Sequence, residues 1–121
     1  LEFFESHRPG EHSLIHNDEQ HEKFTKKSVK LEVDSLDNII NQLNLKKIDF
    51  VKMDIEGAEY EALLGAKKSL LSMNQTNLAI EIHLDNEGPT DVKIIPLLKE
   101  FNFEILESGS SYRMPVFFRK K

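Results

Sequence analysis

Acidic side chains and one histidine follow two short apolar segments of the chain. The side chains of this group that can bind a cation, take up a proton or orient a hydroxyl are Asp54, Glu56, Glu81, His83 and Asp85. The first two follow residues 48–53, and the other three lie at the end of residues 77–84. In an open α/β sheet, ligands bind at the carboxyl ends of the strands. If the two segments are neighbouring strands, both groups therefore face one cleft.

The two segments have the composition of buried strands. Residues 48–53 read Ile-Asp-Phe-Val-Lys-Met, which is short, mostly apolar and β-prone, as in a strand covered on both faces. Residues 77–84 form a second strand. Between them a helix is expected from Gly57 onward, and Gly65 is expected to break or bend it. Gly57 and Ala58 are interpreted as small residues that let this helix pack closely on the sheet.

The rest of the chain alternates strands with helices. The further elements expected are a strand at 29–33, a helix at 36–43 capped by Asp34 or Ser35, a helix at 89–101, and strands at 103–106 and 114–118. Residues 1–28 show no sustained period and are expected to be irregular, with one short strand near 13–16. The order β-α-β-α-β-α-β-β predicts an α/β fold with a mainly parallel sheet and an antiparallel last strand.

The helix after Pro89 has an apolar stripe in its sequence. The residues expected to face inward are Val92, Ile95, Leu98 and Phe101. Pro96 lacks the backbone N–H that a helix interior needs, so the sequence leaves open whether it splits the helix. Asn44 and Asn102 are expected to end the first and the last helix.

Three stretches of the chain resemble the FkbM family of S-adenosylmethionine-dependent methyltransferases. The most specific stretch reads DIEGAE at 54–59 and LLGA at 63–66. Residues 31–37, with the sequence LEVDSLD, are similar to the strand and helix start of that family, and AIEIH at 79–83 is similar to its next strand. The resemblance covers residues 29–84 well and the remainder loosely.

The resemblance implies a Rossmann-like domain that transfers a methyl group from S-adenosylmethionine, usually to a hydroxyl. Asp54 and His83 are then the expected catalytic residues, because either can take the hydroxyl proton, or a divalent ion held by Asp54 can lower the pKa of the hydroxyl. Glu56, Glu81 and Asp85 are the expected substrate-binding residues. The acceptor is a small molecule, and its class is left open between a sugar, a natural product and a lipid headgroup.

The cofactor half of such a domain has no counterpart in the sequence. That half needs a strand, a glycine-rich turn and an acidic residue for the ribose, whereas Gly10 is the only glycine before Gly57. Cofactor-binding residues are therefore not assigned. We expect an irregular segment at 1–28 and the C-terminal part of a methyltransferase domain at 29–121. The alternative is a non-catalytic Rossmann-like module that has lost its cofactor site and binds a partner.

A simpler role exists for the acidic residues around position 56. Carboxylates just before a helix cap its free amides and complement its dipole without any chemistry. We favour capping for Glu56 and Glu59, and an acceptor-site role for Asp54. Glu81 can equally be a buried structural acid, and His83 a hydrogen-bonded residue at the rim.

Composition narrows the classes of partner and compartment. A net charge of -5 with scattered basic residues argues against nucleic-acid binding. The absence of cysteine excludes disulfides, thiolate metal sites and a cysteine nucleophile. No apolar run approaches the roughly 20 residues that span a bilayer, and we expect a cytoplasmic protein. His12 and His16 lack the glutamate of an HExxH motif, so no metal site is expected.

Without the strands of a cofactor half, the sheet is expected to have an exposed edge. An unpaired edge strand tends to pair with another chain, so we expect the stable protein to form a homodimer along this edge. Light scattering tests the expectation. A dimer mass agrees with it, and a monodisperse monomer contradicts it.

Overall fold

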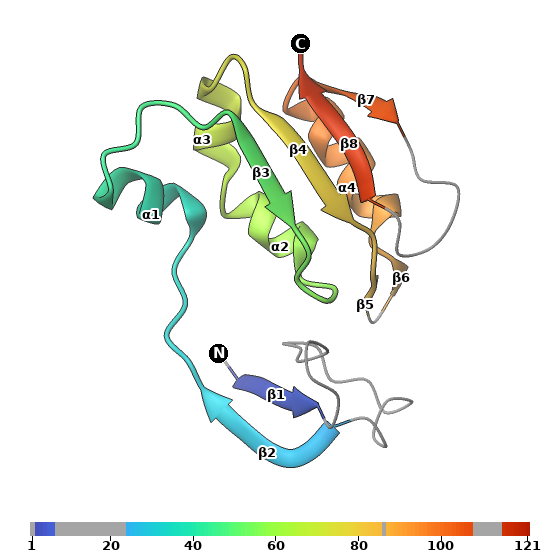
Figure 1. The fold of residues 1–121 in the computed structure, drawn as a ribbon. Coiled ribbons are helices and arrows are strands. Elements are labelled where there is room, and N and C mark those ends of the chain that lie inside the picture. Colours follow the sequence, from blue (N-terminus) through green and yellow to red (C-terminus); the bar gives the residue numbers. More distant parts are fainter. Residues whose placement is uncertain (1, 7–23, 86, 108–114) are drawn as a thin grey trace.

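The computed structural model describes residues 2–6, 24–85, 87–107 and 115–121 (Figure 1). The helices are α1 (Leu36–Gln42), α2 (Glu59–Leu64), α3 (Lys67–Ser72) and α4 (Asp91–Glu100). The strands are β1 (Glu2–Ser6), β2 (Phe24–Lys30), β3 (Phe50–Met53), β4 (Asn77–Glu81), β5 (Leu84–Asp85), β6 (Gly88–Pro89), β7 (Phe103–Glu107) and β8 (Pro115–Lys120). The expected α/β class is confirmed.

The main sheet has four strands in the order β3-β4-β8-β7. β3 and β4 are parallel, with Met53 paired to Ile80, because α2 and α3 form the crossover between them. β8 is antiparallel to β4 and to β7, so the expected antiparallel pairing of the last two strands is confirmed. However, β8 inserts between β4 and β7, which leaves one parallel pair among three. The expectation of a mainly parallel sheet is therefore wrong.

The N-terminal part of the chain contains a second sheet. β1 and β2 pair antiparallel, with Phe3 opposite Val29 (Figure 1). The expectation that residues 1–28 are irregular is therefore wrong at both ends of that segment. The short strand expected near 13–16 lies outside the described residues.

The strand expected at 29–33 is displaced toward the N-terminus. β2 ends at Lys30, and residues 31–35 have no regular structure. Leu31 and Val33 are 45% and 59% exposed, so their alternation with polar residues does not bury an apolar face. The alternation of apolar and polar residues correctly predicted a strand in this region, but it predicted the wrong boundaries.

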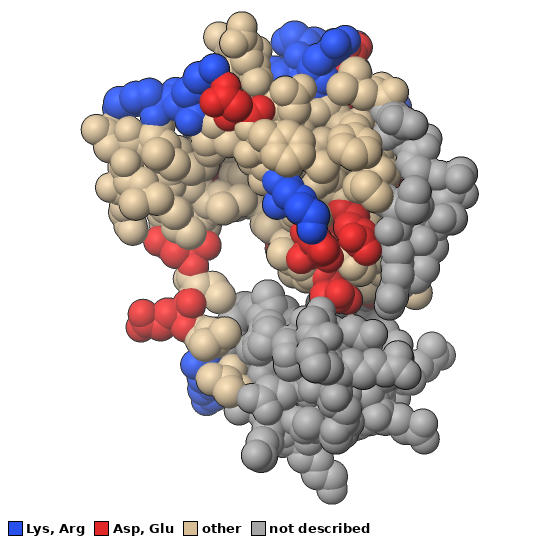
Figure 2. Space-filling view, in the orientation of Figure 1, with Lys and Arg blue, Asp and Glu red and all other residues tan. Residues whose placement is uncertain are grey.

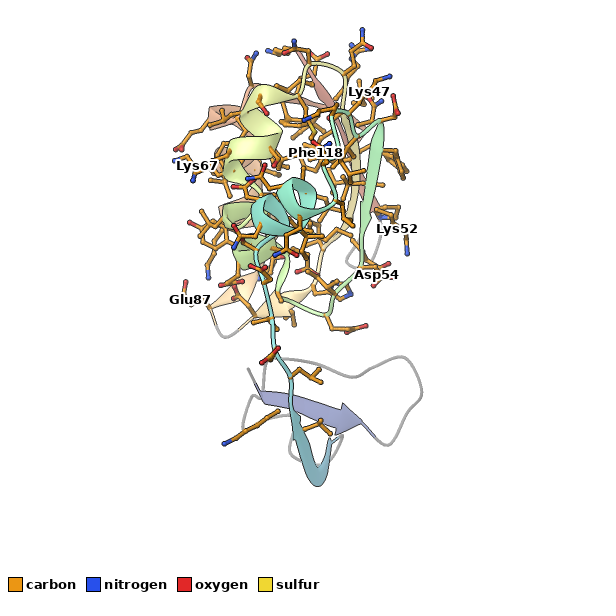
Figure 3. The ribbon with its side chains drawn as sticks, turned by 90° about the vertical axis from the view of Figure 1, so that its left-hand side faces the viewer. Lys47, Lys52, Asp54, Lys67, Glu87 and Phe118 are labelled. Carbon is orange, nitrogen blue, oxygen red and sulfur yellow. The ribbon has the colours of Figure 1, made fainter. Side chains whose placement is uncertain are left out.

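The helices pack on one face of the main sheet. In the side view, the helices lie on one side of β3 and Lys52 projects from the other side (Figure 3). The core between helices and sheet is formed by Met53, Leu63, Leu70, Leu78, Ile80, Ile94, Leu98, Phe101 and Phe118, among others. On the opposite face, Phe50 and Phe117 remain 56% and 37% exposed. Among the described helices, none is long and apolar enough to cross a membrane.

The helix ends follow local signals in the sequence. Ser35 caps α1, and its hydroxyl accepts a hydrogen bond from the Asn38 N–H at 3.2 Å. Asn44 and Asn102 adopt positive φ angles of 53° and 66° just after α1 and α4. Gly65 ends α2 before α3 begins. These four positions confirm the expected boundaries.

α4 differs from its sequence pattern. Pro96 lies inside a continuous helix and does not split it. The inward stripe runs through Ile94, which is fully buried, whereas Val92 is 71% exposed. Val92 precedes Ile94 by two positions, which places it on the other side of a helix with 3.6 residues per turn. The expected inward position of Val92 is therefore wrong.

Lys120 is a buried cation that joins the ends of two helices. Its Nζ donates hydrogen bonds to the carbonyl oxygens of Leu70 in α3 and Phe101 at the end of α4, at 2.6 and 2.5 Å. Burial lowers the pKa of the Lys120 ammonium. A cation at the carboxyl end of a helix also complements the helix dipole. β8 is thereby fixed to both α3 and α4.

Asp37 caps a helix to which it does not belong. α3 begins after Ala66, which offers no capping side chain. Instead, the carboxylate of Asp37 accepts hydrogen bonds from the N–H groups of Ser69 and Lys68 at 2.8 and 3.0 Å. Burial alone raises the pKa of Asp37, but the hydrogen bonds from Ser69 and Lys68 lower it more, so the net pKa lies below its ordinary value. The carboxylate therefore holds α1 against α3.

Replacing Asp37 with alanine removes this cap. We expect the free energy of unfolding at neutral pH to fall by about 1 kcal/mol, as for other lost caps. Because the folded-state pKa is lowered, the contribution is complete above the unfolded pKa and is lost as the pH falls through the folded pKa. Urea unfolding of wild type and Asp37→Ala at neutral and strongly acidic pH measures this difference.

The matched control is Asp49→Ala, since the side chain of Asp49 is 72% exposed and pairs only with Lys47 among the described residues. We expect it to cost less than Asp37→Ala at neutral pH. A deficit of Asp37→Ala that stays the same at neutral and strongly acidic pH contradicts the assignment of the cap to the ionised carboxylate.

Candidate functional site

The carboxyl ends of β3 and β4 bring four of the expected site residues together. Around the Nε2 atom of His83, carboxylate oxygens of Asp54 and Glu81 lie at 3.7 Å and one of Glu56 lies at 3.8 Å. Figure 3 places Asp54 just beyond the end of β3, and Figure 2 shows acidic side chains gathered at this end of the sheet. The proximity agrees with the sequence analysis, and the roles of these residues stay predictions.

The imidazole of His83 is fixed through its second nitrogen. The His83 side chain is 5% exposed, and its Nδ1 lies 2.8 Å from Oε1 of Glu59. This oxygen also accepts hydrogen bonds from backbone amides, so Nδ1 carries the proton between them. When the ring is neutral, Nε2 therefore has a free lone pair that faces the carboxylates.

The backbone of His83 is fixed by Thr90, which precedes α4. The Thr90 N–H donates to the His83 carbonyl at 2.9 Å, and the Thr90 hydroxyl accepts from the His83 N–H at 3.3 Å. Thr90 is fully buried. No pattern in the sequence indicated this pairing, because it depends on how the β5–β6 segment returns the chain to the end of β4.

Glu59 is the principal site residue that sequence reasoning missed. It is fully buried, and besides His83 its Oε1 accepts hydrogen bonds from the N–H groups of Gly57 at 3.1 Å and Ile55 at 3.4 Å. The role that we favoured for it, capping of free amides near the start of α2, is therefore only part of what it does. Its other oxygen, Oε2, is buried and has no hydrogen-bond partner among the described residues.

A signal for Glu59 was present in the spacing of α2. Leu63 and Ala66, at i+4 and i+7 from Glu59, are 1% and 3% exposed. Glu59 thus lies on the inward stripe of its helix, where a carboxylate needs a partner inside the protein. An acidic residue on an apolar stripe was therefore a sign of a buried polar interaction.

The turn between β3 and α2 has an uncommon backbone. Glu56 and Gly57 have φ angles of 55° and 103°. A side chain at the φ of Gly57 would be strained, so glycine is needed for the turn itself and not only for close packing. A positive φ at Glu56 is uncommon for a residue with a side chain and is typical of positions held by their surroundings. The turn brings the Glu56 carboxylate toward His83.

Asp85 does not join the group around His83. Its Oδ2 lies 2.7 Å from Nζ of Lys93, and the same Nζ lies 2.8 Å from Glu87. Burial raises the pKa of Asp85, but the hydrogen bond from Lys93 lowers it more, so the net pKa lies below its ordinary value. A substrate-binding role for Asp85 stays a prediction, and such a role would have to compete with this ion pair.

The acidic surroundings favour positive charge at His83. Burial alone lowers the pKa of the ring, but the hydrogen bond to Glu59 and the charges of Glu59, Glu56 and Glu81 raise it more, so the net pKa lies above its ordinary value. Chemically, the arrangement can take up a proton or hold a cation. Oxygen atoms of Asp54 and Glu56 and a nitrogen of His83 all lie within 4.8 Å of one another.

Comparison with known proteins agrees with the resemblance in the sequence. The AMB antimetabolite synthetase AmbE of Pseudomonas aeruginosa is 32% identical to the chain over 73 residues. That match covers 58% of this chain and 3% of the synthetase, so the chain corresponds to a small part of that protein. No solved structure matches the chain.

The family comparison covers most of the chain. The methyltransferase FkbM domain matches residues 2–105, which include the β1–β2 sheet, the turn after β3 and the whole group around His83. A match of this extent shows the family of the chain. The chain belongs to the FkbM methyltransferase domain family.

Proposed function

We propose that this domain transfers a methyl group from S-adenosylmethionine to a hydroxyl of a small molecule. The observation that carries the proposal is the convergence of the Asp54 carboxylate on the His83 imidazole, at 3.7 Å, in a chain of a methyltransferase family. A hydroxyl must lose its proton around the time of methyl transfer. A carboxylate and an imidazole at the acceptor position can take up that proton or orient the hydroxyl for its loss.

Asp54 is the member of the group most open to an acceptor. Its side chain is 37% exposed, compared with 5% for His83. Lys52 lies 3.0 Å from Oδ2 of Asp54, while Oδ1 faces His83. Glu56 and Glu81, with side chains 28% and 25% exposed, would line the acceptor site and accept hydrogen bonds from further hydroxyls.

The charge of the site favours some acceptors over others. Four carboxylates surround one imidazole, which disfavours an acceptor that carries a phosphate, such as a phospholipid headgroup. The relative from Pseudomonas aeruginosa is named as a synthetase of an antimetabolite. Of the three acceptor classes expected from the sequence, we therefore favour a hydroxyl on a natural product or its precursor.

The turn at Gly57 does not have the form of a cofactor-binding glycine turn. A phosphate- or nucleoside-binding glycine turn needs open backbone amides, whereas the turn at Gly57 donates its amide to the buried carboxylate of Glu59. The cofactor would supply an electrophilic methyl group, and the residues discussed here would act on the acceptor alone. We assign no cofactor-binding residue in this chain.

We infer a Rossmann-like fold in which the main sheet is the C-terminal half. β3 is an edge strand of that sheet, and Phe50 on it is 56% exposed. The strands of a cofactor half would extend the sheet from this edge. A homodimer formed along the same edge, as expected from the sequence, would be an alternative use of the same backbone groups.

Asp54→Asn tests the acceptor role, because it keeps the size of the side chain and removes its charge. We expect methyl transfer from radiolabelled S-adenosylmethionine to a panel of hydroxylated amino acids, phenols and glycosides to fall on the order of 10²- to 10⁴-fold. Binding of S-adenosylmethionine, measured by calorimetry on the same protein, should not change, because Asp54 is placed on the acceptor side.

Glu61→Gln is the matched control, since Glu61 is an exposed acid on α2 and its replacement causes the same change in net charge. It should leave transfer unchanged. Full transfer by Asp54→Asn would refute the role of this carboxylate. Both assays use the natural protein that contains this domain, and absence of S-adenosylmethionine binding by that protein would instead favour the non-catalytic binding module.

A further inference from the structure

Three donor atoms from two strand ends converge on one point. The Nε2 atom of His83 lies 3.7 Å from an oxygen of Asp54 and 3.8 Å from an oxygen of Glu56, and the three atoms lie within 4.8 Å of one another. Around a cation with bonds of about 2.1 Å, neighbouring donor atoms are about 3.0 Å apart and opposite ones about 4.2 Å. Small side-chain rotations would therefore bring all three atoms onto one cation.

The ring nitrogen of His83 is the strongest sign of a ligand. The side chain is 5% exposed, and the nearest oxygens to Nε2 lie at 3.7 Å, beyond hydrogen-bond distance. Nε2 is aimed at the carboxylates of Asp54, Glu56 and Glu81, at distances of 3.7 to 3.8 Å that leave room for a cation between the atoms. An imidazole nitrogen and carboxylate oxygens that face one another in this way form a donor set that a divalent cation accepts.

Two of the three donor side chains, His83 and Asp54, are already oriented by other residues. Glu59 accepts the hydrogen bond from Nδ1 of His83, at 2.8 Å, which is the arrangement that directs Nε2 of a metal-binding histidine toward its ion. Lys52 lies 3.0 Å from Oδ2 of Asp54, which leaves Oδ1 turned toward His83. Two of the three ligands, His83 and Asp54, are therefore oriented before a cation binds.

Charge also favours a cation at this point. The carboxylates of Asp54, Glu56, Glu59 and Glu81 all lie within 3.8 Å of a ring nitrogen of His83. Several negative charges in one partly buried site repel one another, and a divalent cation among them offsets this repulsion.

We propose that Asp54, Glu56 and His83 bind one divalent cation, with Mn²⁺ as the best fit. Carboxylate oxygens suit hard cations and imidazole suits first-row transition metals, and Mn²⁺ accepts both kinds of donor. From the sequence, a divalent ion at Asp54 was one of two alternatives for the loss of the hydroxyl proton, and no contiguous metal-binding motif was found. Here the ligands come from the ends of two strands that only the fold brings together.

The role of this cation rests on the proposed methyl transfer. A hydroxyl bound to a divalent cation has a lowered pKa and a fixed position. The cation, with Asp54, Glu56 and His83 as its ligands, would therefore bind an acceptor hydroxyl at the end of β3. Glu81, outside the group of three, would accept the proton that the hydroxyl loses.

Mn²⁺ binding can be measured on the protein without S-adenosylmethionine or acceptor, from the loss of the electron paramagnetic resonance signal of free Mn²⁺. We expect one bound ion per chain. Asp54→Asn and Glu56→Gln should each weaken binding about tenfold or more, and Glu59→Gln should weaken it by about 10- to 100-fold through the orientation of His83. Glu61→Gln, the exposed acid on α2, should bind as the wild type does.

Asp54 and Glu56 are partly exposed, so their variants should fold, and thermal unfolding without metal checks this. A wild-type protein that binds no Mn²⁺ would overturn the proposal, as would an Asp54→Asn variant that binds it as tightly as Glu61→Gln. The Mn²⁺ measurement contains neither cofactor nor acceptor, so a failed methyl-transfer assay does not change its outcome. In the same way, a protein that binds no Mn²⁺ can still be tested for methyl transfer.

Discussion

The site depends on one buried hydrogen bond, between the Glu59 carboxylate and the His83 imidazole. Both groups are almost completely removed from solvent, and a carboxylate in that position is costly unless it is well paired. Glu59 is compensated by the ring of His83 and by the amides of Gly57 and Ile55. One carboxylate thus connects α2, the turn after β3 and His83, which lies two residues after the end of β4. Removing it would release all three at once.

Other features of the fold position the side chains around this hydrogen bond. Parallel pairing of β3 and β4 brings the two strand ends to one edge, so that Asp54 and His83 are neighbours despite their distance in sequence. Positive φ angles at Glu56 and Gly57 reverse the chain tightly enough for α2 to start beneath the site. Thr90 holds the backbone of His83 from the start of α4. Helices α2 and α4 therefore position the site residues at the ends of β3 and β4.

Local patterns in the sequence predicted the elements that bury apolar side chains and the ends of the helices. They also predicted that Asp54, Glu56, Glu81 and His83 would meet, because strand ends in such a sheet share an edge. They could not place β8 between β4 and β7, because that pairing joins residues far apart in the chain. For the same reason they could not reveal the pairing of Glu59 with His83, 24 positions away. They also could not reveal the pairing of Asp85 with Lys93, and the substrate-binding role of Asp85 stays a prediction.

Nitrogen-15 nuclear magnetic resonance of the His83 ring, in metal-free protein, tests the central claim most directly. The chemical shifts of the two ring nitrogens report which of them carries the proton when the ring is neutral. The hydrogen bond to Glu59 predicts a proton on Nδ1 and a bare Nε2 that faces Asp54 and Glu56. A neutral ring with its proton on Nε2 would contradict the account, because that nitrogen could then neither take up a proton nor bind a cation.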